Sequence, residues 1–152
     1  MTHKILEKLA KEQSALFALV EPLSEAQLDT QYGEGWTIRE ILTHLWNAEE
    51  DHCRVIATIA KGEHARLEAS LNLEEHNATR LAERGTLTKA DVLAGLATQR
   101  ARTEGLFNRF SEEQLALEGR HPALGQMSID KIFRIIGIHE KMHVLEITEA
   151  LK

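Results

Sequence analysis

Apolar residues recur at intervals of three and four, the spacing of amphipathic helices, over four long stretches of this chain. These stretches cover about residues 3–20, 38–61, 88–110 and 129–151. A shorter helix is expected at about residues 73–84, before Gly85. No segment combines β-branched residues with strict apolar–polar alternation, so no strands are expected.

Start and stop signals support these boundaries. Thr37 with Glu40, and Thr88 with Asp91, have the spacing of capping boxes, and Gly62 suits the left-handed position that closes a helix. The pattern predicts an all-α protein, a four-helix bundle with a longer connection that carries a short helix between the second and third long helices. At 152 residues, the chain is expected to form a single domain over residues 1–152.

Two histidines four residues apart, His139 and His143, lie in the last helical stretch. Residues at this spacing lie on one face of a helix, where two imidazoles can hold one metal ion. Steps of three and four from Ile136 lead through His139 and His143 to Ile147, so the pair occupies the predicted core stripe. Polar rings buried there need partners. We interpret them as metal ligands, with a hydrogen-bonded core pair as the alternative.

A third ligand is available from the second helix. His44 is rotated by only about 40–60° from Ile41 and Ala48, at 100° per residue, and so lies at the edge of the core stripe. One histidine opposite the pair would complete a three-nitrogen site. Such a site leaves positions for water or substrate, as catalytic rather than structural sites do. An ordinary hydrogen-bonded histidine is the alternative for His44.

Three further residues are candidates for a role beside the ligands. His52 continues the stripe of the second helix and could orient a ligand, bind the metal or simply pack at the core edge. Arg100 interrupts an apolar stripe, so it either meets an acidic substrate group or pairs with Glu49 or Glu50. Glu146 could orient the ring of His143, three residues before it.

The sequence from His139 to His143 also matches the His-Glu-x-x-His pattern of zinc proteases. Most variants of that pattern need a third ligand well downstream, but only nine residues follow His143. Glu140 is turned about 100° from the histidines, so we expect it to face solvent. The protease interpretation is therefore rejected.

Composition excludes several classes of partner. The formal net charge is −6 and the cationic residues are scattered, which disfavours nucleic acid and anionic membrane surfaces. No window has the roughly 18 apolar residues of a membrane span, and the charged N-terminus does not read as a secretory signal. Cys53 is the single cysteine, which suits a reducing compartment. We expect a cytoplasmic protein.

Three segments of the chain match short motifs in a fixed order. The first is Trp36-Thr37-Ile38-Arg39-Glu40-Ile41-Leu42-Thr43-His44-Leu45, which matches W-[ST]-x-x-E-x-x-x-H-L. The second is His121-Pro122-Ala123-Leu124-Gly125-Gln126-Met127-Ser128, which matches an H-P-x-x-G-x-[ML]-[ST] loop. The third is Ile138-His139-Glu140-Lys141-Met142-His143, which matches a closing x-H-x-x-x-H helix. In this order, the three segments resemble the DinB-like (DinB/YfiT) family.

This resemblance implies a four-helix bundle that binds one divalent metal ion through His44, His139 and His143. It also implies that members often pair as homodimers and that some relatives are transferases or isomerases working with low-molecular-weight thiols. Zinc or nickel suits an all-imidazole site, and iron or manganese is compatible with it.

Three hypotheses for the function follow. The leading one is a metal-dependent enzyme of the thiol-transferase or hydrolase type that acts on a small-molecule substrate. The second is a non-catalytic, metal-stabilised binding or assembly module. The third is a plain helical bundle without metal.

Overall fold

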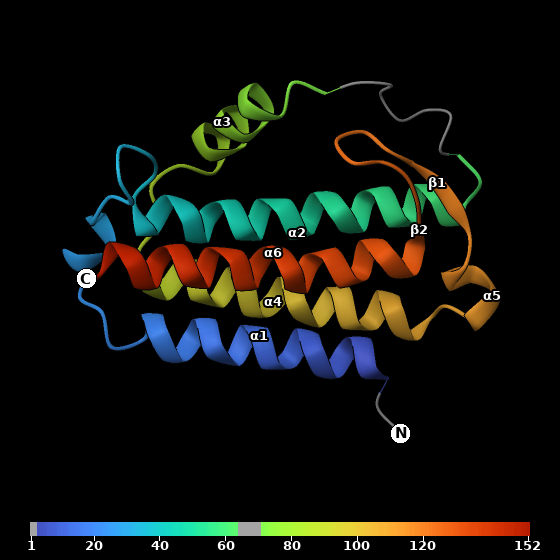
Figure 1. Ribbon diagram of the computed structural model, residues 1–152, viewed down its shortest axis with the longest axis horizontal. Helices are drawn as coiled ribbons and strands as arrows, with labels where there is room; N and C mark the ends of the chain where they lie inside the picture. The colour runs from blue at the N-terminus through green and yellow to red at the C-terminus, as the bar shows by residue number, and fades with distance from the viewer. Residues whose placement is uncertain (1–2, 64–70) are drawn as a thin grey trace.

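The computed structural model describes residues 3–63 and 71–152. It confirms the all-α four-helix bundle (Figure 1). None of the helices in the described part of the chain is long and apolar enough to cross a membrane. The four long helices are α1 (Lys4–Val20), α2 (Ile38–Ala60), α4 (Lys89–Asn108) and α6 (Ile129–Ala150).

The last helix occupies the central position in this bundle. α6 packs against both α1 and α2, and α2 packs in turn against α4. On the remaining side, Arg100 of α4 donates a hydrogen bond to the carbonyl of Leu9 in α1. α1 and α6 run in one direction and α2 and α4 in the other (Figure 1). The α6 histidines that the sequence predicts as ligands therefore lie at an antiparallel seam with α2.

The connection between α2 and α4 carries the short helix α3 (Leu73–Arg84), as the sequence predicts. α3 lies along the outside of α2, where Arg80 pairs with Glu50 and Arg84 donates to the Asn47 side chain. α4 begins at the same end of the bundle as α2 (Figure 1). The connection is thus a crossover that returns the chain along the bundle.

The expectation of no strands is wrong. A hairpin of β1 (Glu118–His121) and β2 (Gly125–Ser128) lies between α4 and α6, directly after the one-turn helix α5 (Glu112–Leu115). A second one-turn helix, η1 (Gln27–Asp29), lies between α1 and α2. Its strands are four residues long and contain no β-branched run, so the pattern gives no signal. The hairpin is instead held by tertiary packing. Gly119 lies so close to Ile59 that a Cβ on residue 119 would be 2.6 Å from Ile59 Cγ1.

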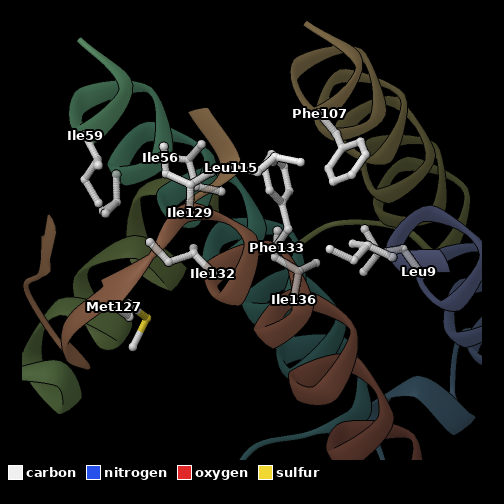
Figure 2. Packing of buried hydrophobic residues seen from close by; sticks show 12 residues of the cluster. Leu9, Ile56, Ile59, Phe107, Leu115, Met127, Ile129, Ile132, Phe133 and Ile136 are labelled. Atoms are coloured by element: carbon white, nitrogen blue, oxygen red, sulfur yellow. The ribbon is translucent and has the colours of Figure 1, made fainter. Parts of the chain in front are cut away.

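The interior divides into two apolar clusters separated by a polar layer. The cluster nearer the hairpin includes Phe107 and Phe133, whose rings meet edge to face at 5.1 Å between centroids (Figure 2). The other cluster fills the opposite end around Leu42 and Ile147. Between them, every long helix contributes buried polar residues: Glu12, Glu49, Gln99, Arg100, Thr103, Glu140 and His143.

Candidate metal centre

Three histidines from two helices meet where the apolar clusters give way to the polar layer. His139 Nε2 lies 3.1 Å from His44 Nε2 and 3.0 Å from His143 Nε2. The three ligand atoms all lie within 4.8 Å of one another. The structure thus brings together the residues that the sequence singled out as metal ligands.

Local structure explains this convergence. α2 begins at a capping box in which Thr37 and Glu40 bond reciprocally, so the helix starts at a fixed residue and His44 falls in its second turn. The ring of Trp36 packs against that of His44, with 4.8 Å between centroids. On α6, the four-residue spacing stacks His139 and His143, whose ring centroids are 4.5 Å apart.

Burial keeps all three imidazoles neutral at pH 7. Loss of solvent, together with the neighbouring histidines, lowers the pKa of His44 from 6.5 to about 3. Burial also lowers the pKa of His139 to about 4, and repulsion from a protonated His143 lowers it further in the same direction. Burial alone lowers the pKa of His143 to about 4. Neutral imidazole is the form that binds a metal ion, so the lone pairs are available.

Glu146 fixes which nitrogen of His143 is free. The Nδ1–H of His143 donates to the Glu146 carboxylate one turn further along α6. The proton is thereby held on Nδ1, and the lone pair of Nε2 points toward the other two histidines. A carboxylate on the far nitrogen is the usual partner of a metal-binding histidine. Glu146 therefore lies where the sequence placed it.

The donor set fits a divalent ion. A ring nitrogen of a neutral imidazole is either a donor or an acceptor, so His139 Nε2 cannot donate to one neighbour while it accepts from the other. Ligand nitrogens about 2.0–2.1 Å from one ion lie about 2.9 Å apart in octahedral and about 3.4 Å apart in tetrahedral geometry. Two of the three spacings, 3.0 and 3.1 Å, fall within that range, and all three lie within 4.8 Å.

A cleft of about 370 Å³ opens onto the three histidines. Such a volume suits a small molecule. His52, His121 and the Asp51–His76 pair lie further along the same wall, and no lysine or arginine is among the described lining residues. The rest of the lining is apolar: Trp36, Ala48, Leu71, Leu73, Ala123, Leu124, Ile135 and Met142, with Asn77 the exception.

Arg100 lies in the core rather than in the cleft. Its guanidinium donates to both oxygens of Glu49 at 3.0 and 3.1 Å and to Glu140 at 3.1 Å. The Leu9 carbonyl accepts a further hydrogen bond at 2.6 Å. Of the two interpretations that the sequence allowed, the geometry matches the ion pair with Glu49, and Arg100 is not among the described residues that line the cleft.

The expected exposure of Glu140 is also wrong, since only 2% of this residue is exposed. Steps of four and seven from Ile136 reach Glu140 and His143, and this is the stripe that faces the core. His139 lies at its border and lines the cleft. The helical pattern alone cannot place a carboxylate inside a bundle, because the cation that compensates it comes from another helix.

His52 does not join the cluster of three among the described residues. Its Nδ1 instead lies 2.9 Å from Nε2 of His121, at the end of β1. No pattern in the sequence pairs these two residues, although the His-Pro-x-x-Gly segment could have drawn attention to His121. Neither His3 nor His76 joins the cluster, and His64 lies outside the described residues.

Comparison with known proteins places this geometry in a family. The model of the DinB superfamily matches residues 8–147. No curated protein matches the chain. Solved structures match it with identities too low to show more than the fold.

Three such structures are informative. YfiT from Bacillus subtilis, described as a probable metal-dependent hydrolase with an unusual four-helix bundle topology, has a TM-score of 0.78 at 22% identity, over 97% of this chain and 83% of its own. The four-helix bundle protein TT2238 has a TM-score of 0.72 at 20% identity, over 96% of this chain and 97% of its own. The mycothiol-dependent maleylpyruvate isomerase has a TM-score of 0.80 at 16% identity, over 95% of this chain but only 59% of its own.

Proposed function

Because the chain belongs to the DinB superfamily, we propose that it is a metal-dependent enzyme of the thiol-transferase or hydrolase type. In this proposal His44, His139 and His143 hold one divalent ion, zinc or nickel being the best match to three imidazoles. The observation that carries the proposal is the convergence of their three Nε2 atoms beside an apolar cleft.

The residues around the site have separable tasks. A divalent ion with open positions supplies an activated thiol or water at neutral pH. Glu146 holds the proton of His143 on Nδ1, and Trp36 packs against His44 so that its ring keeps one orientation. The apolar cleft excludes water from a small substrate. Arg100 and Glu140 stabilise the core behind the turn of α6 that carries His139 and do not enter the cleft.

The names of the similar structures support both reaction classes. YfiT is described as a probable metal-dependent hydrolase, and the isomerase is described as mycothiol-dependent. We therefore propose a low-molecular-weight thiol or water as the nucleophile and a small molecule as the second substrate. The cleft favours this proposal over a purely structural metal site, because a structural site is closed by protein ligands.

Metal analysis tests the first half of this proposal. Purified protein is expected to bind about one zinc or nickel ion per chain, and His44→Ala and His139→Ala are each expected to abolish tight binding. His76→Ala is the matched control, since His76 lines the same cleft outside the cluster. Full metal content in either ligand variant would contradict the ligand set.

Turnover tests the second half. Metal-loaded protein is incubated with cellular thiols and electrophilic substrates, and with esters in the absence of thiol. Chelated protein and metal-loaded His44→Ala serve as controls. Product formation that requires the metal supports an enzyme. Stoichiometric metal binding with no turnover of any class would instead favour the non-catalytic binding module.

A further inference from the structure

We propose that His52 is a substrate-recognition residue whose Nε2–H, set in place by His121, donates a hydrogen bond to a neutral carbonyl oxygen of the bound substrate. This inference rests on the proposed function and adds a second polar point to the cleft. His44 and His52 are eight residues apart on α2, or about 12 Å along the helix axis. The cleft would thus hold the reacting atom at the three histidines and the carbonyl near His52.

The hairpin fixes the tautomer of His121. Its Nδ1 accepts hydrogen bonds from the backbone N–H groups of Ala123 and Leu124, at 3.1 and 3.3 Å. Backbone amides only donate, so Nδ1 carries no proton and the single proton of the neutral ring lies on Nε2. Gly125, with φ of +85°, allows the tight turn that aims both amides at the ring.

The proton on His121 in turn fixes the tautomer of His52. His121 Nε2 lies 2.9 Å from His52 Nδ1, so His121 donates and His52 accepts. The proton of His52 must then lie on Nε2. Burial lowers the pKa of His121 and brings that of His52 to about 3, consistent with two neutral rings. The chain of bonds from the hairpin amides therefore ends in one N–H donor.

This donor has no protein acceptor among the described residues, while the ring of His52 forms part of the cleft wall. A donor that is held in place on the half-buried ring of His52, with no protein acceptor, favours a ligand in the cleft that accepts from it. No lysine or arginine is among the described lining residues, and Asp51 is on the same wall. A neutral amide, ester or ketone carbonyl therefore suits the site better than a carboxylate, which would lack a cation.

Long-range ¹H–¹⁵N spectra of the imidazoles test the tautomers without any substrate. In the zinc-loaded, ¹⁵N-labelled protein at pH 7, both His52 and His121 are expected to carry their proton on Nε2. His121→Phe is expected to release the tautomer of His52 into a mixture. A proton on Nδ1 of His52 in the unmodified protein would overturn the inference.

Binding of matched thiols to the cobalt-loaded protein tests recognition. The probes are ω-mercapto-N-methylamides with one to five methylene groups, each paired with the alkanethiol of equal length. The thiolate–cobalt absorption band reports binding. The compared quantity is the amide preference, defined as the Kd of the alkanethiol divided by the Kd of the amide of equal length. At the chain length that reaches His52, this preference is expected to be roughly tenfold larger in the wild type than in His52→Phe. His52→Gln retains an N–H donor and is expected to recover part of this preference.

His76→Gln, on the same wall, is the control and is expected to leave the preference unchanged. The outcomes also separate the two proposals. Normal cobalt and thiol binding with the same amide preference in the wild type and His52→Phe would overturn the role of His52 alone. Failure of the wild type to bind cobalt at its histidines would overturn the proposed function, and this inference with it.

Discussion

Arg100 of α4 and Glu140 of α6 form a buried ion pair directly behind the three-histidine cluster, with 3.1 Å between Nη2 and Oε1 and 2% of each residue exposed. Glu140 follows His139 in the sequence, so one turn of α6 presents an imidazole to the cleft and a carboxylate to the core. Glu49 shares the same guanidinium. The bundle interior therefore holds two carboxylates around one cation.

Arg100→Met is expected to destabilise the protein strongly. The substitution leaves Glu49 and Glu140 buried without a cation, and loss of one partner from a buried pair costs about 3–5 kcal/mol in the free energy of unfolding. Urea denaturation measures this loss, with the exposed neighbour Arg102→Met as the control. Zinc affinity per folded molecule is expected to change little. A stable variant that bound no zinc would show that Arg100 acts on the site rather than on the core.

Stability of the metal-free protein is expected to fall as the pH falls from about 6.5 to about 4. The pKa values of His44, His139 and His143 in the folded chain lie below the ordinary 6.5, so the unfolded state binds more protons in this window. Burial raises the pKa of Glu140 to about 7 and also raises that of Glu146, and these two groups act in the opposite direction but are outnumbered by the three histidines.

Urea midpoints of chelator-treated protein between pH 4 and 7 measure this dependence. His44→Phe is expected to flatten the profile, because it removes one of the histidines with a lowered pKa. Stability that rose on acidification would contradict the neutral, buried state of the cluster.

Glu146→Gln is expected to weaken zinc binding by roughly 10- to 100-fold, as loss of an orienting carboxylate usually does. In this variant the Nδ1–H of His143 can still donate to the amide oxygen of residue 146. The negative charge that makes the imidazole a better ligand is lost, however. Titration calorimetry against zinc gives the affinity. Glu149→Gln, one turn from the site and exposed, is the matched control. Equal affinity in the two variants would mean that Glu146 does not support the ligand.

Two glycines of α4 are expected to respond in opposite ways to alanine. A Cβ at Gly95 would lie 2.3–2.5 Å from the Trp46 ring, so Gly95→Ala is expected to cost about 1–3 kcal/mol. Nothing lies within 4 Å of a Cβ at Gly105, where alanine is expected to stabilise the helix by about 0.5–1 kcal/mol. Thermal melts of the pair test the packing of α4 on α2. Equal shifts would contradict it.

The helices could be predicted from sequence because their signals are local. Apolar spacing and capping residues placed the crossover helix at residues 73–84, and α3 spans Leu73–Arg84. The three histidines could also be selected from the sequence, because two lie one turn apart on one helix and His44 lies at the edge of the facing stripe. That they bind a metal ion remains a proposal.

The features that were missed depend on distant partners. Glu140 can be buried because Arg100 pairs with it. Arg100 lies on a different helix, so the pattern of α6 alone does not reveal this partner. The hairpin forms where Gly119 packs closely on Ile59, and its strands have no periodic signal of their own. The bond between His52 and His121 exists only once that hairpin is in place, so neither residue could be interpreted alone.

X-ray absorption spectroscopy of the protein loaded with one equivalent of zinc tests the central claim most directly. We predict three imidazole nitrogens at about 2.0–2.1 Å from the zinc, with the multiple scattering that imidazole rings produce. In His44→Ala, the number of imidazole ligands is predicted to fall from three to two. A coordination sphere of oxygen atoms with no imidazole scattering would contradict the three-histidine centre.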